Sequence, residues 1–126
     1  PEAIAQKAVR HILDSIGAGT AGAIAPETTI LTQTLHAAGE GSGAAPLWGR
    51  GEKMTPLNAA LVNGTASHAF ELDDTGGCDH SGAVVVPAAV AALELAGRPV
   101  SGKEFITAVV LGYDIARSAL EASGAY

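Results

Sequence analysis

The stretch "HAFELDDTGGCDHSGAVVVPAA" (residues 68–89) joins the most charged part of the chain to its most hydrophobic part. Its first thirteen residues (68–80) gather two histidines, a glutamate, three aspartates and the lone cysteine, although only 16% of the whole chain is charged. An apolar run from Gly82 to Leu93 follows directly. Three interpretations are open: a helix start preceded by solvated loop charges, a metal site, or an acid/base site set against an apolar wall.

The apolar run decides the fold class. Its valines would also suit a strand, but its alanines, its length and the position of Pro87 favour a helix. Because the run is apolar on all sides as far as Glu94, it predicts a helix that is buried all round. Ser81 is a natural N-cap for this helix.

Helical spacing of apolar residues predicts four further helices. The first covers residues 2–16, and its small-residue end (17–22) favours close packing against a neighbour. The second begins at Pro26 and closes at Gly39, and the last opens with a capping box of Ser101 and Glu104. The remaining helix starts at Thr55-Pro56 and is expected to bury Leu57 and Leu61, next to an extended segment with Trp48 buried and Arg50 and Lys53 exposed. The sum is an all-α chain of about five helices.

Length and composition limit the classes of function. A chain of 126 residues supports one domain (1–126), and a net charge of −6 without a basic cluster argues against a nucleic-acid or anionic-membrane surface. Cys78 has no partner for an internal disulfide, and no apolar run is long enough to span a bilayer. We therefore expect a soluble, cytoplasmic protein.

The charged loop itself leaves its alternatives open. Turn residues and a helix dipole account for the charges without any function. A metal site would use His68, Asp73, Asp74 and His80, although their spacing matches no dense ligand motif. A thiol site would pair Cys78 with His80, without an evident oxyanion hole.

The acid/base interpretation fits the residue types best. His80 lies just before a predicted helix N-terminus, where the dipole lowers imidazole basicity and favours a substrate carboxylate. The apolar helix behind it lowers the local dielectric and sharpens shifts of pKa. A neighbouring carboxylate would fix the tautomer of the ring.

The segment "TPLNAALVNGTASHAFELDDT", followed by His80 and "GAVVVPAA", resembles the N-terminal part of the MmgE/PrpD family. "AVRHILDSIGAGTAG", "LWGRGEKMTPLNAALVNG" and "SGKEFITAVVLGYDIA" match other parts of that family in the same order, so the resemblance covers nearly the whole chain. The family includes 2-methylcitrate dehydratases, cis-aconitate decarboxylases and iminodisuccinate epimerases.

The resemblance implies a cofactor-independent and metal-free lyase or isomerase that moves a proton beside a carboxylate of a small di- or tricarboxylate. It implies His80, Asp73 and Thr75 as catalytic residues, and Glu71 and Asp74 as substrate-binding residues. His68, Cys78 and Asp79 receive no role from it. Ser81 departs from the family pattern, which commonly has proline after the active-site histidine, and the loop before His80 is one residue shorter than in some members.

Family enzymes are several hundred residues long, are usually homodimers and carry a lid over an all-helical domain. The resemblance therefore implies that residues 1–126 are part of the helical domain, with the lid and further site residues elsewhere. Arg50 and Lys53 are the only cations near the loop in sequence, too few for a polycarboxylate. The competing hypothesis is a non-catalytic helical domain that self-associates.

Overall fold

The computed structural model describes residues 1–75 and 80–124 and confirms an all-α class with five helices and one very short hairpin. The helices are α1 (Glu2–Gly22), α2 (Pro26–Ala37), α3 (Pro56–His68), α4 (Ser81–Leu95) and α5 (Gly102–Ala122). The antiparallel strands β1 (Ala45–Pro46) and β2 (Lys53–Met54) pair Ala45 with Met54 and Pro46 with Lys53.

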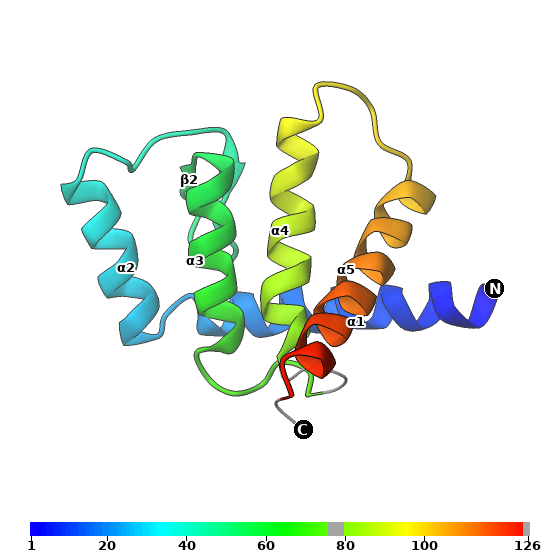
Figure 1. Ribbon diagram of the computed structural model, residues 1–126. Helices are drawn as coiled ribbons and strands as arrows, with labels where there is room; N and C mark the ends of the chain where they lie inside the picture. The colour runs from blue at the N-terminus through cyan, green and yellow to red at the C-terminus, as the bar shows by residue number, and fades with distance from the viewer. Residues whose placement is uncertain (76–79, 125–126) are drawn as a thin grey trace.

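Helix α1 lies along the base of the molecule and crosses the lower ends of α3 and α4 (Figure 1). Helix α2 packs on one side of α3, whereas α5 packs on α4 and reaches back to α1. The described residues of the loop that joins α3 to α4 lie at this base, and Asp74 in this loop contacts His11 on α1 and Tyr113 on α5 (Figure 1). Three helices therefore converge on the charged loop.

Two predicted helix starts are confirmed and one is wrong. The Thr55 hydroxyl accepts a hydrogen bond from the Asn58 amide, and Ser101 and Glu104 form a reciprocal capping box. Ser81 is not the N-cap of α4: it is the first helical residue, and His80 occupies the cap with a left-handed backbone (φ 58°). The side chain of His80 makes no capping hydrogen bond, so this helix start depends on a more distant group.

The predicted close packing of the small-residue end of α1 is confirmed. A Cβ atom at Gly22 would lie 1.8 Å from the carbonyl oxygen of Ala66, and one at Gly19 would lie 2.5 Å from the ring of Trp48. Helix α3 presents small residues to this surface, because Ala66 and Ser67 are both buried there. The two backbones approach so closely that no side chain fits between them.

The same close approach reverses the face of α3 that we expected to be buried. Leu57 and Leu61 are exposed, whereas Val62 and the polar Asn63 are buried. Burial of the polar Asn63 side chain is tolerated because it is hydrogen-bonded. Its oxygen accepts from the Trp48 amide at 2.9 Å, and its nitrogen donates to the Pro46 carbonyl at 3.0 Å.

Three further expectations need correction. Helix α4 is not buried all round, since α3 and α5 cover one side and leave Val84 and Leu95 exposed. Trp48 is only partly buried. Arg50 is partly buried rather than exposed, because its guanidinium donates to the carbonyl of Ala23 at 2.7 Å.

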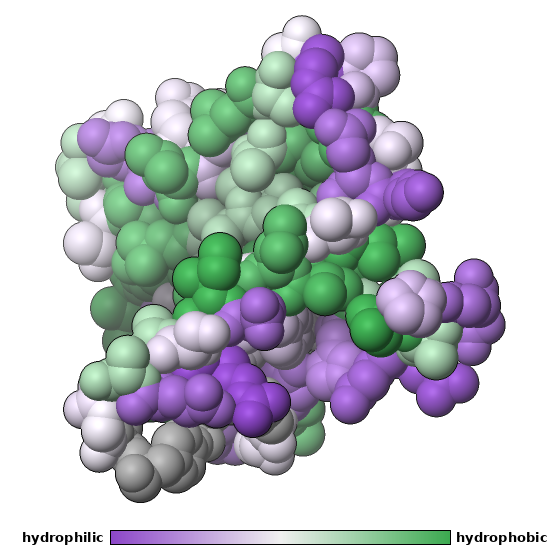
Figure 2. Space-filling view, turned by 45° about the vertical axis from the view of Figure 1, so that its right-hand side comes forward, coloured by the Kyte–Doolittle hydropathy of each residue, from purple (hydrophilic) through white to green (hydrophobic). Residues whose placement is uncertain are grey.

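Hydrophobic side chains gather on the face that carries α4 and α5 (Figure 2). In the described part of the chain, no helix combines the length and the apolar character that crossing a membrane requires.

The α1–α3 contact gives a test of this packing. Gly22→Ala forces the two helices apart and should lower the free energy of unfolding by about 1–3 kcal/mol. Gly17→Ala is the matched control, because Gly17 lies on the same helix and no atom lies within 4 Å of the position that its Cβ atom would take. This control should gain about 1 kcal/mol from helix propensity. Urea unfolding followed by circular dichroism measures both, and equal stabilities would contradict the close approach.

Candidate functional site

Two strained residues mark the ends of the charged loop. Glu71 and His80 adopt positive φ angles of 53° and 58°, and they are the two non-glycine residues of the described chain in this region. Such a conformation costs about 1–3 kcal/mol per residue and persists where the surrounding structure enforces it. Both strained residues are predicted site residues, so the strain falls where we expect function.

The His80 ring turns inward onto Asp73. Its Nδ1 lies 3.0 Å from Oδ2 of Asp73, whose side chain is 0% exposed, while the His80 side chain is 30% exposed. A buried carboxylate against Nδ1 favours a proton on that nitrogen, which leaves Nε2 free to exchange a proton with another molecule. The acidic neighbour that we expected beside His80 is therefore Asp73, which contacts Nδ1 of the ring.

Glu71 and His68 complete this cluster. Oxygens of the Glu71 carboxylate lie 3.6 Å from Nε2 of His80 and 3.3 Å from Nε2 of His68. Nδ1 of His68 lies 3.3 Å from Oδ1 of Asp73, and the two imidazole rings meet edge to face with centroids 4.2 Å apart. Two imidazoles are therefore held between the same two carboxylates. We call these four residues (His68, Glu71, Asp73 and His80) the histidine–carboxylate cluster.

Asp74 points away from this cluster and into the scaffold. Its Oδ1 accepts a hydrogen bond from the Gly82 amide at 2.8 Å, which caps the N-terminus of α4 from eight residues away. Its Oδ2 lies 2.5 Å from Nδ1 of His11 on α1 and accepts a hydrogen bond from the Tyr113 hydroxyl on α5 at 2.6 Å. Asp74 thus ties the loop to three helices.

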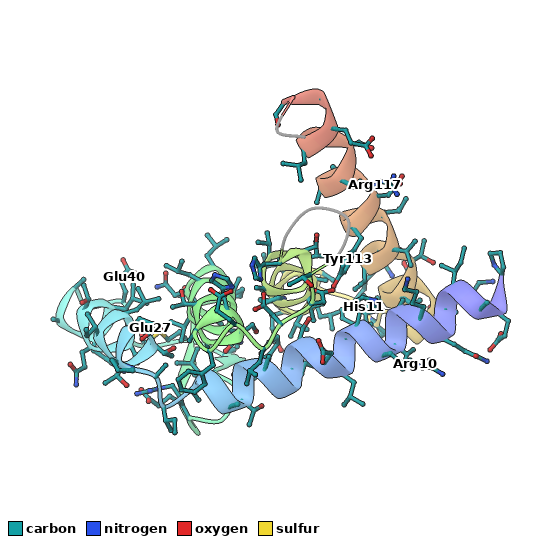
Figure 3. The ribbon with its side chains drawn as sticks, turned by 90° about the horizontal axis from the view of Figure 1, so that it is seen from below. Arg10, His11, Glu27, Glu40, Tyr113 and Arg117 are labelled. Carbon is teal, nitrogen blue, oxygen red and sulfur yellow. The ribbon has the colours of Figure 1, made fainter. Side chains whose placement is uncertain are left out.

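The surroundings of Asp74 are tightly packed. His11 and Tyr113 lie beside each other, with ring centroids 5.4 Å apart (Figure 3). A Cβ atom at Gly82 would lie between 2.4 and 3.0 Å from the side-chain oxygens of Ser15, Asp74 and Tyr113, so only glycine fits. Burial, and then the hydrogen bond to Asp74, raise the pKa of the Tyr113 hydroxyl well above its ordinary value.

Thr75 is exposed and makes no side-chain hydrogen bond with the described residues. Its catalytic role stays a prediction, as does substrate binding by Asp74, whose oxygens already have three partners. Cys78 and Asp79 lie outside the described residues, and so does the thiol site that would use Cys78.

Three of the four residues of the metal hypothesis come together. His68, Asp73 and His80 each offer a ligand atom, and these atoms lie within 4.8 Å of one another, whereas Asp74 is not in the group. Imidazole and carboxylate suit a divalent ion. The hydrogen-bonded and ion-pair contacts within the cluster account for the same arrangement with protons alone. The expected absence of a metal and of a cofactor stays a prediction.

Sequence reasoning missed His11 and Tyr113, and it considered His68 only as a metal ligand. His68 ends α3 and could have been placed beside Asp73 from their short separation. His11 and Tyr113 lie 63 and 39 residues from Asp74, so no local pattern connects them to the loop.

Comparisons with known proteins agree with this architecture. Residues 1–125 match the MmgE/PrpD N-terminal domain, so the chain belongs to the MmgE/PrpD family. The chain is 33% identical over 119 residues to a cis-aconitate decarboxylase of Aspergillus terreus, which covers 90% of this chain and 24% of that protein. It is 31% identical to the human cis-aconitate decarboxylase, over 89% of this chain and 24% of the human protein. It is also 31% identical to a cis-aconitate decarboxylase-like protein of Aspergillus oryzae, over 90% of this chain and 25% of that protein.

The chain thus spans about a quarter of the length of these curated relatives. No solved structure matches it.

Tyr113 gives a pH-dependent test of the scaffold. The unfolded chain ionises its tyrosines near pH 10, whereas folding raises the pKa of Tyr113. Above about pH 10 the unfolded state therefore loses this proton first, and stability falls as the pH rises. Tyr113→Phe should cost about 1–2 kcal/mol at pH 7, from the lost hydrogen bond to a carboxylate, and should weaken the alkaline decline. Urea unfolding at pH 7 to 11 measures both, and an equally steep decline in the variant would contradict this assignment.

Proposed function

We propose that this chain supplies the proton-transfer part of a lyase that acts on a small polycarboxylate, with cis-aconitate decarboxylation as the reaction to test first. The observation that carries the proposal is the 3.0 Å contact between Nδ1 of His80 and the buried Asp73. Family membership and the names of the relatives support the same chemistry. Dehydration or epimerisation of a related acid would use the same proton carrier.

Decarboxylation makes a definite demand on the protein. One carbon–carbon bond breaks, carbon dioxide leaves, and the electron pair remains on the acid, where an adjacent double bond or carboxylate spreads the charge. A carbon atom of this anion then takes a proton. An imidazolium is a suitable donor near neutral pH because its ordinary pKa lies close to that pH.

His80 meets this demand through its second nitrogen. Nε2–H donates the proton to carbon, and the bonding pair stays on the ring, which becomes neutral imidazole. Asp73 keeps Nδ1–H in place throughout and stabilises the charged ring before transfer. Glu71, 68% exposed and 3.6 Å from Nε2, lies where it can orient the ring or the substrate. We assign Thr75, which is exposed in the loop, to a hydrogen bond with a substrate carboxylate.

The charge of the cluster restricts what the chain binds by itself. In the described residues, neither Glu71, Asp73 nor Asp74 forms an ion pair with lysine or arginine. Arg50 is already bound to Glu52 at 3.0 Å and to the Ala23 carbonyl. A substrate with several carboxylates needs cations, so we propose that other parts of the whole protein provide them.

The second candidate function is self-association without catalysis. Exposed apolar side chains on all five helices of the described chain favour it, among them Leu57, Val84, Leu95 and Ile115. A homodimer that buries this surface is compatible with catalysis as well. The two functions separate in activity, because only the first requires His80.

His80→Gln in the whole protein should lower kcat for decarboxylation of cis-aconitate at least 100-fold, because general acid catalysis contributes about 10²–10⁴-fold. Release of carbon dioxide measures the rate, and circular dichroism checks the fold. His36→Gln is the matched control, because His36 lies on α2, away from the cluster, and its Nε2 is 2.8 Å from a carboxylate oxygen of Glu52. This variant should retain full activity. Full activity of the His80 variant would refute the proposed role, and the self-association function would remain.

The 126-residue chain alone should bind cis-aconitate weakly or not at all. The carboxylates of the loop repel a polycarboxylate, and among the described residues none of them forms an ion pair with lysine or arginine. Isothermal titration calorimetry at pH 7 tests this expectation. A dissociation constant in the micromolar range would show that the chain holds a complete binding site.

A further inference from the structure

The histidine–carboxylate cluster presents two imidazoles to one solvent-exposed carboxylate. Nε2 of His68 lies 3.3 Å from one oxygen of Glu71, and Nε2 of His80 lies 3.6 Å from the other. The proposed reaction uses Nε2 of His80 alone and gives no role to His68. Two imidazole nitrogens and a carboxylate oxygen are the ligand set of zinc sites in which one position stays open.

The separations of these atoms suit a tetrahedral ion. Zinc lies about 2.0–2.2 Å from nitrogen and oxygen ligands, so two ligands of one tetrahedral ion are about 3.3–3.5 Å apart. The separations of 3.3 and 3.6 Å between Nε2 and the Glu71 oxygens lie close to this value. Both exceed the usual length of an N–H···O hydrogen bond, about 2.7–3.2 Å. The three side chains are thus spaced for a shared ion rather than for direct hydrogen bonds.

Asp73 contacts both rings at their other nitrogens. Its oxygens lie 3.3 Å from Nδ1 of His68 and 3.0 Å from Nδ1 of His80, and its side chain is 0% exposed. A histidine that binds a metal commonly donates its second ring N–H to a carboxylate, which fixes the tautomer and the orientation of the ring. One buried carboxylate does this for two histidines here. The bare nitrogen of each ring is then the Nε2 that faces Glu71.

Asp73 is also an alternative ligand, because its carboxylate and the two histidines each offer an atom within 4.8 Å of the others. An ion held by Asp73 and the two Nδ1 atoms would lie on the buried side of the cluster. Exposure favours the other side, since the side chains of His80, His68 and Glu71 are 30%, 45% and 68% exposed. An ion that arrives from solvent meets these three first, and Asp73 supports the rings from behind.

The charge and the ligand types indicate which ion fits. In the described residues, neither Glu71 nor Asp73 pairs with lysine or arginine, and a buried carboxylate without a positive partner is strongly disfavoured. A divalent cation supplies positive charge to Glu71 directly and to Asp73 through the ring N–H groups. Imidazole suits zinc, whereas magnesium and calcium prefer a larger set of oxygen ligands.

We propose that His68, His80 and Glu71 bind one Zn²⁺ ion, with Asp73 holding the two rings, and that this ion inhibits the whole protein. Binding takes the lone pair of Nε2 on His80, so this nitrogen no longer carries the proton that the reaction moves. The ion is an inhibitor and not a cofactor, so the expectation of a metal-free reaction is unaffected. The inhibition rests on the proposed function, whereas the binding site does not.

Calorimetric titration of the 126-residue chain with zinc chloride tests the site. The wild type should bind one ion per chain, and an excess of magnesium should not compete. His68→Phe keeps a ring at this position and removes both nitrogens. It should weaken zinc binding at least 100-fold, because loss of an outer partner of a metal ligand already costs about 10–100-fold. Circular dichroism checks that each variant keeps its helices.

His36→Phe is the matched control. His36 also pairs with a glutamate, Glu52, at 2.8 Å, but in the described chain it belongs to no group of three such ligands. This variant should bind zinc as the wild type does. Glu71→Gln keeps the size of the side chain and removes its charge, and it should weaken zinc binding at least about 10-fold.

Histidine ¹⁵N chemical shifts identify the ligand atoms. In the wild type with zinc, Nε2 of His68 and of His80 should carry the metal, while both Nδ1 atoms stay protonated. Metal on the Nδ1 atoms, absence of binding, or equal binding by the wild type and His68→Phe would each overturn the proposal. If His68→Phe does not fold, the shifts of the wild type decide.

In the whole protein, zinc should slow the release of carbon dioxide from cis-aconitate, and a chelator should restore the rate. A metal buffer sets the free zinc concentration, because the carboxylates of the substrate also bind zinc. Each protein is compared with its own rate without zinc. His68→Phe should need at least 100-fold more free zinc than the wild type for the same fractional inhibition. Equal sensitivity to zinc would overturn the inhibition.

The zinc site and the proposed function fail separately. Zinc bound at both Nε2 atoms of a protein that shows no decarboxylation would refute the proposed function, and the inhibition with it, and leave the site. Decarboxylation by a protein that binds no zinc at the cluster would overturn the site and leave the proposed function.

Discussion

The structure depends on one constraint: two adjacent aspartates of the loop point in opposite directions. Asp74 binds the Gly82 amide, His11 and Tyr113, and so fixes the loop to the helices. Asp73 is thereby buried on the other side, where two imidazoles face it. The left-handed backbone at both Glu71 and His80 is tolerated because these contacts enforce it.

The different contacts of Asp74 and Asp73 explain why the charged residues lie beside the most hydrophobic helix. The purely structural interpretation of the loop accounts for Asp74, and the functional interpretation stays a proposal for Asp73 and His80. Asp74 does what a capping residue does, although it acts from eight residues away rather than from the cap position itself. Asp73 has no such structural partner and is surrounded by titratable groups. A loop that is rigid on one side can hold a proton carrier on the other.

The sequence predicted the helices well because their signals are local. Two helix starts are predicted from motifs of at most four residues, Thr55-Pro56 and the pair Ser101 and Glu104. The glycines before residue 23 predict close packing of helices. The prediction of the buried face of α3 was wrong because leucines are normally found in the core. Here the backbone contact with Gly22 requires small residues on the buried face. The exposed side of α4 was missed because periodicity cannot tell which neighbours cover an apolar helix.

The sequence predicted most residues of the candidate site but not how these residues contact one another. The resemblance gave His80, Asp73 and Glu71, which the structure brings together, and it gave Asp74, whose partners lie on distant helices. His68 entered only as a candidate metal ligand, because spacing along the sequence cannot show that two rings share both carboxylates.

The most direct measurement of the central claim is the tautomer of His80 in the neutral ring, read from the ¹⁵N chemical shifts of labelled histidine above its titration range. If the buried Asp73 holds the ring as described, the proton lies on Nδ1 and Nε2 is bare. A proton on Nε2, with Nδ1 bare, would mean that Asp73 does not hold His80, and the proton-transfer account would fail.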